Sequence, residues 1–435
     1  MLSISHSCPP KHRSIFMIAK IMVVDDDQKF RESIVRSLVM NDYEVLEASN
    51  GKEALGVLTM EHVDLILSDV KMPTLNGIEF LHRIKREKAE IPFIMMTGFS
   101  EVIEIKEAYE IGADGFLAKP YREDDLLFQI NKIEHAEDEQ GQAKQGFIGV
   151  YIEEFVAGAN IKYPIYIEVD EGNYVKIANE GENLSAKQIQ EFKEKGTDYF
   201  YLADNDFLKY IEFNYTIKNS ILRSSRIENV KKVKFLKILT NHITKYMLLK
   251  EVNEEVLAYL VELRSEVVKQ IQADNESLQS LCEITSHSEK MVDVYSISAF
   301  IGTYLMSKLD WATETVLSDI FAACLLQDVA AGLDESKLSR EHPYLSAEIV
   351  KQTDLFDDKF CEAVAHHHEK LDGSGFPSGL CGGKINVLGN MVLLATSMAE
   401  KIVYRKMTFS DAVIVVLNME STFYRQEYID LLKRV

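Results

Sequence analysis

Cysteine and long apolar runs are both scarce in this chain of 435 residues. The cysteines are odd in number, lie far apart and form no Cys-x-x-Cys pair; they are Cys8, Cys282, Cys324, Cys361 and Cys381. This pattern does not fit a disulfide framework and favours reduced thiols in the cytoplasm. No apolar run reaches the roughly 18 residues that a membrane-spanning helix needs. We therefore expect a cytoplasmic protein without membrane insertion.

Basic residues are also fewer than acidic ones, with 48 Lys and Arg against 69 Asp and Glu and a formal net charge of −21. Nucleic acids and anionic membranes are polyanions, so this charge argues against nonspecific binding to either. No basic recognition helix is evident, which disfavours a transcription factor and predicts no nucleic-acid partner. Glycine and proline are few, and the hydrophobic content of 46% is typical of globular proteins.

The length predicts roughly three domains, and composition places their boundaries. Residues 1–16 lack a long apolar core and are predicted to be a disordered extension, which leaves Met1 or Met17 as the true start. The remaining segments are an α/β domain, a polar acidic linker, a small α+β module and an all-α domain, at residues 17–135, 136–146, 147–216 and 217–435.

Short apolar runs alternate with amphipathic segments in the first domain. The predicted strands are Lys20–Val24, Tyr43–Glu47, Val63–Ser68, Pro92–Thr97 and Gly115–Ala118. Segments between them, such as Phe30–Met40 and Ile78–Arg86, have the apolar spacing of helices. This alternation predicts a doubly wound parallel sheet of five strands, with the functional residues at the carboxyl ends of the strands.

Polar side chains stand where those strands end. Asp25, Asp26 and Asp27 follow the first strand, Asp69 follows the third, Thr97 ends the fourth and Lys119 follows the fifth. Carboxylates that converge repel one another unless a hard cation such as Mg²⁺ neutralises them. One carboxylate can then attack a phosphoryl donor while the metal and the lysine offset the developing charge.

With this set of residues, the first domain resembles the receiver domain of two-component response regulators. The resemblance implies that Asp69 accepts a phosphoryl group from a sensor histidine kinase, and that Asp25, Asp26 and Asp69 hold Mg²⁺. It also implies that Thr97 hydrogen-bonds the phosphoryl group, that Lys119 pairs with it, and that Phe116 is the aromatic switch residue. Receivers often pair on phosphorylation, so a homodimer is expected.

The middle module carries no cluster of ionisable residues. Its predicted strands are Phe147–Phe155, Tyr163–Val169, Tyr174–Ala178 and Tyr199–Leu202. Ser185 and Gln188 form a capping box that predicts a helix to about Lys195. Its role as a spacer, a ligand sensor or a purely structural element stays open.

The last domain has helical apolar spacing, for example over Val233–Leu249 and Val256–Ile271. Ligand-type side chains recur within it, and they predict a transition-metal site: Glu283, His287, Asp328, His342, His367 and His368. The loop Gly375-Phe376-Pro377 follows the last two histidines closely. Its glycine lets the backbone approach a ligand.

Residues 280–410 resemble the HD-GYP family of bacterial phosphodiesterases, which open cyclic di-GMP. The resemblance rests on His367-His368-Glu369 and on Gly375-Phe376-Pro377, with Phe where the family has Tyr. It implies two or three metal ions, commonly iron or manganese, that activate water for attack on the phosphodiester. It also implies that the loop and Arg405 bind cyclic di-GMP.

Three positions depart from the family pattern. Gln327 replaces the histidine of the His-Asp pair, Ala331 replaces a lysine, and Thr396 stands where the late metal-binding aspartate is expected. An amide oxygen and a hydroxyl are weak ligands, so the first metal site should be lost and the remaining site only partial. Loss of one electrostatic contributor typically costs about a hundredfold in rate.

These observations leave three hypotheses for the output domain. It is predicted to be a degenerate HD-GYP domain that mainly binds cyclic di-GMP or a protein under the control of Asp69. The second hypothesis is a phosphorylation-switched phosphodiesterase with atypical metal ligands. The third is an interaction scaffold that binds no nucleotide.

Overall fold

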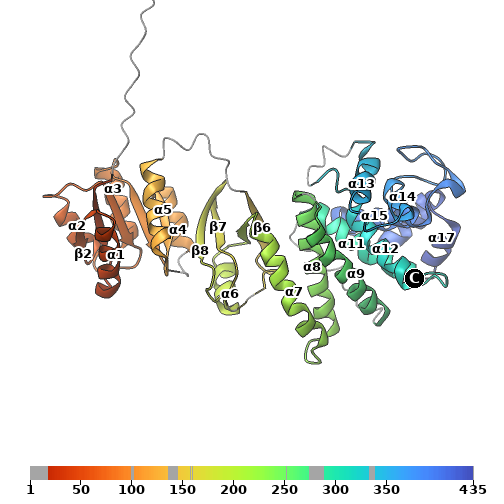
Figure 1. Cartoon of the computed structure of the whole chain (residues 1–435), viewed down its shortest axis with the longest axis horizontal. Coiled ribbons are helices and arrows are strands. Elements are labelled where there is room, and N and C mark those ends of the chain that lie inside the picture. The colour runs from red at the N-terminus through yellow and green to blue at the C-terminus, as the bar shows by residue number, and fades with distance from the viewer. Residues whose placement is uncertain are drawn as a thin grey trace, which may run out of the picture. The chain divides into compact units, whose positions relative to one another are not determined.

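The computed structural model describes residues 18–98, 102–135, 146–156, 158, 160–250, 252–273, 289–332 and 339–434. The predicted extension at 1–16, and all of the predicted linker except Gly146, lie outside these residues. The chain divides into two units, Met1–Asp206 and Phe207–Val435. Figure 1 shows their elements along the chain.

The first domain is the predicted doubly wound parallel sheet. Its elements are β1 (Lys20–Val24), α1 (Gln28–Met40), β2 (Glu44–Ala48), α2 (Gly51–Val57), β3 (Leu65–Asp69), α3 (Gly77–Glu87), β4 (Phe93–Thr97), α4 (Val102–Ile111), β5 (Gly115–Ala118) and α5 (Glu123–Glu134). The strands lie in the order β2-β1-β3-β4-β5, and all neighbours are parallel. The predicted fold class is therefore confirmed.

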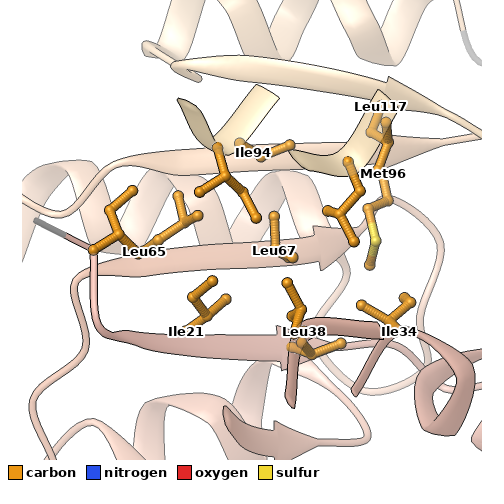
Figure 2. Close-up of a cluster of buried hydrophobic side chains, with 12 residues drawn as sticks. Ile21, Ile34, Leu38, Leu65, Leu67, Ile94, Met96 and Leu117 are labelled. Carbon is orange, nitrogen blue, oxygen red and sulfur yellow. The ribbon is translucent and has the colours of Figure 1, made fainter. Parts of the chain in front are cut away.

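The hydrophobic core of this domain explains the strand pattern. Alternate residues of the central strands, among them Ile21, Leu65, Leu67 and Ile94, point to the same side of the sheet and meet Leu38 of α1 (Figure 2). The residues between them are buried as well, because helices cover both faces of a parallel sheet. Continuous apolar runs in the sequence are the consequence, and they place the polar residues at the strand ends.

The middle module is a four-stranded antiparallel sheet with one helix. It contains β6 (Phe147–Tyr151), β7 (Ile165–Asp170), β8 (Asn173–Ala178), α6 (Ala186–Glu194) and β9 (Tyr199–Ala203), in the strand order β6-β9-β7-β8. The helix begins as predicted, since Ser185 caps α6 and the side chain of Gln188 completes the capping box. The first strand ends at Tyr151, four residues before the predicted end, because the chain turns at residues 152–154.

The second unit is all-α. Its helices are α7 (Phe207–Arg223), α8 (Asn229–Leu249), α9 (Glu254–Ala273), α11 (Lys290–Met306), α12 (Glu314–Leu326), α13 (His342–Lys351), α14 (Asp358–Ala365), α15 (Val387–Arg405), α16 (Phe409–Val415) and α17 (Gln426–Leu432), with short turns η3 (Gly382–Lys384), η4 (Val416–Glu420) and η5 (Ser421–Phe423). Helix α11 is buried along most of its length and packs against α12 and α15. These three helices form the centre of the unit.

One described helix is long and apolar enough to cross a membrane. It is α15, and 67% of its most apolar window is buried inside the all-α unit. The core helix of a globular domain meets the same criteria of length and composition as a membrane span. The burial of α15 explains why its sequence is apolar.

Candidate functional sites

Carboxylates and a lysine meet at the carboxyl end of the parallel sheet. Asp25 and Asp26 follow β1, Asp69 ends β3 and Lys119 follows β5. The Nζ atom of Lys119 lies 2.7 Å from Asp25 Oδ2 and 2.5 Å from Asp69 Oδ1. Carboxylate oxygens of Asp25, Asp26 and Asp69 lie within 4.8 Å of one another. Such a group of oxygens suits a hard cation of the size of Mg²⁺.

The two other residues predicted for this site lie on the adjacent strands. Thr97 is buried at the end of β4, beside Ala118 of β5. The backbone N–H of Lys119 donates to the carbonyl of Thr97 at 2.7 Å, which fixes the lysine at the same edge of the sheet. Phe116 lies within β5 and is buried.

Two further residues shape this site, and neither was identified from the sequence. The ring of Phe30 lies under the Lys119 ammonium, 4.6 Å from centroid to Nζ, in a cation–π contact. Gly77, the first residue of α3, lies so close to β3 that a Cβ atom there would be 2.0 Å from the carbonyl oxygen of Asp69. Only glycine allows this approach, so α3 depends on Gly77 for its position beside the acidic site.

Asp27 has a different role from its two acidic neighbours. It caps α1, and its Oδ1 accepts from the backbone N–H groups of Lys29 and Phe30 at 2.9 and 3.0 Å. The bond from Phe30 is the main reason that the pKa of Asp27 is lowered. This carboxylate binds the N-terminus of α1, so the acidic site consists of Asp25, Asp26 and Asp69.

In the all-α unit, four of the predicted metal ligands come together. Asp328 lies in the turn after α12, His342 begins α13, and His367 and His368 follow α14. Each offers one ligand atom, and all four atoms lie within 4.8 Å of one another. Asp328, His342 and His367 are almost fully buried. Glu283 and His287, which were predicted to join them, lie outside the described residues.

Hydrogen bonds to the backbone orient two of these imidazoles. Nδ1 of His342 lies 2.6 Å from the carbonyl oxygen of Ser339, and Nδ1 of His367 lies 2.6 Å from that of Val364. A carbonyl only accepts, so each Nδ1 carries the proton and each Nε2 presents a lone pair. Both Nε2 atoms therefore face Asp328 as acceptors.

The facing acceptor atoms have the spacing of ligands around one ion. Asp328 Oδ1 lies 2.7 Å from His342 Nε2 and 3.3 Å from His367 Nε2, and the two Nε2 atoms are 3.2 Å apart. Metal–ligand bonds of about 2.0–2.2 Å place adjacent ligand atoms roughly 3 Å apart. With both imidazoles neutral and protonated on Nδ1, the buried Asp328 Oδ1 receives no hydrogen bond from them. The residues present thus fit a transition-metal ion.

Burial and neighbouring charges shift the pKa values of the side chains in this cluster. Burial lowers the pKa of His368 to about 2, which keeps its ring neutral at physiological pH. Burial alone would raise the pKa of Asp328, but the neighbouring His367 and His342 outweigh it and lower that pKa. For His342, contact with Asp328 outweighs burial and raises the pKa. A proton and a metal ion therefore compete for the same lone pair.

Where the sequence predicted a missing metal site, the structure shows a neutral hydrogen-bonded pair. The hydroxyl of Thr396, on α15, donates to Oε1 of Gln327 at 3.1 Å. The amide nitrogen of Gln327 donates to the carbonyl of Cys324 at 3.0 Å. Gln327 is completely buried and Thr396 nearly so. These two side chains satisfy each other, so neither is left with an unpaired group that needs a cation.

Glu369 holds the Gly-Phe-Pro loop rather than a metal. Its buried carboxylate accepts from the backbone N–H groups of Ser378 at 2.7 Å and Leu380 at 2.8 Å. Gly375 makes the turn possible, because a Cβ atom there would be 2.4 Å from the backbone nitrogen of Lys370. The loop thus folds back against the histidines, and the ring of Phe376 stacks on His368 with 4.4 Å between centroids.

Other predicted and unpredicted residues surround the cluster. Ala331 is buried and contributes no charge, and Pro377 follows Phe376 through a cis peptide bond. Arg405 is exposed at the end of α15, and among the described residues it makes no hydrogen bond or ion pair. Tyr295 of α11 hydrogen-bonds Asp328, and burial is the main cause of its raised pKa. Tyr295 has no signal in the sequence beyond its helical position.

Comparisons with known proteins give separate matches for the two ends of the chain. The family model of the response regulator receiver domain matches residues 21–131, and that of the HD domain matches residues 327–425. The response regulator MprA of Mycolicibacterium vanbaalenii is 35% identical over 117 residues, which are 27% of this chain and 51% of that protein. The probable transcriptional regulator ycf27 of Pyropia yezoensis is 38% identical over 114 residues, or 26% of this chain and 46% of that protein.

The chain spans about half the length of these curated relatives. Among solved structures, Bd1817, an HDG"Y"P protein from Bdellovibrio bacteriovorus, matches with a TM-score of 0.52. The match covers 66% of this chain and 99% of that one at 15% sequence identity. At that level of identity the likeness concerns the fold alone.

Proposed function

Starting from a chain that joins a response regulator receiver domain to an HD-GYP-like domain, we propose that phosphorylation of Asp69 controls an output domain that binds its ligand instead of hydrolysing it. The ligand we propose is cyclic di-GMP or a protein. The hydrogen-bonded pair of Gln327 and Thr396 carries this proposal. By the resemblance to the HD-GYP family, these two positions would carry ligands of a further metal ion, and a pair of ions would stabilise both the attacking and the leaving oxygen.

The single ligand cluster supports binding. Asp328, His342, His367 and His368 would hold one ion, for which we propose iron or manganese. When bound, the ion supplies positive charge for a phosphate group. The exposed guanidinium of Arg405 offers a second cation for a phosphate group.

Purified full-length chain tests this proposal. Calorimetric titration with cyclic di-GMP, after loading with Mn²⁺ or ferrous iron, should show binding, while formation of linear di-GMP stays at the background level. Arg405→Ala should weaken the binding, and Lys406→Ala, the exposed neighbour, serves as the matched control. Turnover that His367→Ala abolishes would refute the effector and establish the phosphodiesterase.

The intact four-residue cluster is the observation that keeps the phosphodiesterase as a second candidate. One transition metal can lower the pKa of a bound water to about 7 without a partner ion. The scaffold hypothesis makes a different prediction, namely no binding of the dinucleotide with or without metal. The titration and the assay for linear di-GMP together therefore separate a dinucleotide-binding effector, a phosphodiesterase and a scaffold.

For the receiver domain, we propose that Asp69 takes its phosphoryl group from a sensor histidine kinase with Mg²⁺ bound by Asp25, Asp26 and Asp69. The contact between Lys119 and Asp69 supports this assignment. Intact mass measurement after treatment with acetyl phosphate and Mg²⁺ should show one phosphoryl group. Asp69→Asn should remove it, whereas Asp27→Asn, which alters only a helix cap, should keep it.

A further inference from the structure

Two sheet edges meet inside the N-terminal unit. β5 is the last strand of the parallel sheet, and β8 is the last strand of the antiparallel sheet. β8 packs against β5, and α4 packs against β7. An edge strand exposes backbone groups that attract other strands. Here the two edge strands pack against each other, so the middle module lies against the receiver strand that precedes Lys119.

Polar side chains along β8 bind the receiver domain. Asn173, at the start of β8, donates from Nδ2 to the hydroxyl oxygen of Tyr109 on α4 at 2.8 Å. Lys176, in the middle of the strand, forms an ion pair with Asp125 in the first turn of α5. Both partners of this pair are mostly shielded from solvent, with 24% and 19% of their side chains exposed. Such shielding makes an ion pair stronger than one on an open surface.

The third contact lies next to the acidic site. Asn179, directly after β8, is buried and donates from Nδ2 to the carbonyl oxygen of Pro120 at 2.9 Å. Pro120 follows Lys119, whose ammonium contacts Asp69. The residue that contacts Asp69 and the residue that contacts the middle module are thus neighbours in the chain.

We infer that β8 of the middle module is the built-in partner of the receiver domain, and that it senses the phosphorylation state of Asp69 through Lys119 and Pro120. The inference rests on the proposed phosphorylation of Asp69. It gives the middle module a function that its sequence does not indicate. The partner surface includes Asn173, Lys176, Asn179 and the carbonyl of Glu180, which accepts from the Arg122 guanidinium at 3.1 Å.

The direction of the effect follows from the geometry at Asp69. Lys119 Nζ contacts a carboxylate oxygen of Asp69 at 2.5 Å, which leaves no space for further atoms between them. A phosphoryl group adds about −1.5 to −2 charges and three acceptor oxygens, so the ammonium must shift to pair with them. We expect this shift to extend through the Lys119 backbone to the adjacent Pro120 carbonyl and to weaken its hydrogen bond from Asn179. On this expectation, phosphorylation loosens β8 from β5.

Hydrogen exchange of the full-length chain tests this inference. With Mg²⁺ and beryllofluoride, an analogue of the phosphoryl group, amide exchange over residues 173–179 should rise at least fivefold. Exchange in α6, on the same module, should stay unchanged. Asp69→Asn should abolish the response. Intact mass after acetyl phosphate treatment is measured in parallel, and it reports on phosphorylation itself.

Thermodynamic linkage supplies an independent measurement, because a coupling between two sites acts equally in both directions. Asn179→Ala and Lys176→Ala should each tighten calorimetrically measured beryllofluoride binding about fivefold or more. Lys187→Ala is the matched control, since within the described part of the chain this exposed lysine on α6 pairs only with Glu191 of its own helix. It should leave the affinity unchanged.

The outcomes separate this inference from the proposed function. Absence of a phosphoryl group on Asp69 refutes the proposed function of the receiver domain and this inference with it. Phosphorylation with unchanged exchange in β8, or with unchanged or weaker beryllofluoride binding in Asn179→Ala, refutes this inference alone. Faster exchange together with tighter binding supports it.

Discussion

The buried pair of Gln327 and Thr396 leads to a quantitative prediction. Thr396→Val keeps the volume and shape of the side chain but removes the hydroxyl that donates to Gln327 Oε1 at 3.1 Å. Gln327 is completely buried, so no water reaches its oxygen in place of the hydroxyl. A buried acceptor without a partner costs about 1–3 kcal/mol. We therefore expect Thr396→Val to destabilise the all-α unit by that amount.

The chain contains one tryptophan, Trp311, and it lies in the all-α unit. Its fluorescence during urea denaturation reports the unfolding of this unit separately from the other. With a urea dependence of about 2–3 kcal/mol/M, the expected loss moves the midpoint down by roughly 0.3–1.5 M. This shift is well above the error of the measurement.

Thr303→Val is the matched control. Thr303 is also completely buried, but its hydroxyl donates to the carbonyl of Ala299 within α11, at 2.7 Å. That carbonyl already accepts a helical hydrogen bond, so the loss of the hydroxyl costs less. Gln327→Met combined with Thr396→Val removes both polar groups and should restore most of the stability. Equal midpoints for Thr396→Val and the parent chain would refute the account of this pair.

Three further perturbations have defined outcomes. Glu369→Gln keeps only one acceptor oxygen for the N–H groups of Ser378 and Leu380. It should lower the free energy of unfolding by about 1.5–3 kcal/mol and weaken metal and nucleotide binding. Unchanged urea midpoints would contradict this. Burial lowers the pKa of His242 to about 3, so below pH 6.5 the unfolded chain takes up a proton that the folded chain excludes. The free energy of unfolding should therefore fall by about 1.4 kcal/mol per pH unit as the pH drops towards 3. In urea denaturation at different pH values, His242→Leu should flatten this slope. Gly77→Ala places a methyl group against the Asp69 carbonyl and should abolish phosphorylation by acetyl phosphate; normal phosphorylation of a folded variant would show that α3 can move.

The receiver fold could be predicted from the sequence because each of its strands is marked by a short apolar run of neighbouring residues. A parallel sheet with both faces covered requires continuous apolar runs, and these runs place each strand within two residues of its observed position. The polar residues that interrupt them must then converge at one edge. Asp25, Asp69 and Lys119 were predicted on this basis, and the structure brings them together.

Contacts between distant segments could not be predicted in the same way. Gln327 and Thr396 are 69 residues apart, and no local pattern shows that an amide and a hydroxyl will satisfy each other. Glu369 follows two histidines that are candidate metal ligands, and only the folded loop shows that its carboxylate binds backbone N–H groups. The start of the second unit at Phe207, within the segment assigned to the middle module, depends on packing of α7 against α8.

The charge that a metal ion would give the cluster is compatible with the proposed binding without hydrolysis. A divalent ion held by Asp328 and the neutral rings of His342, His367 and His368 would retain a net charge of about +1. A phosphodiester carries one negative charge, so the attraction between them remains. The pair of Gln327 and Thr396 is neutral and supplies no second centre of positive charge for the oxygens that attack and leave. Loading the cluster with metal should therefore strengthen binding of the intact dinucleotide without an increase in its cleavage.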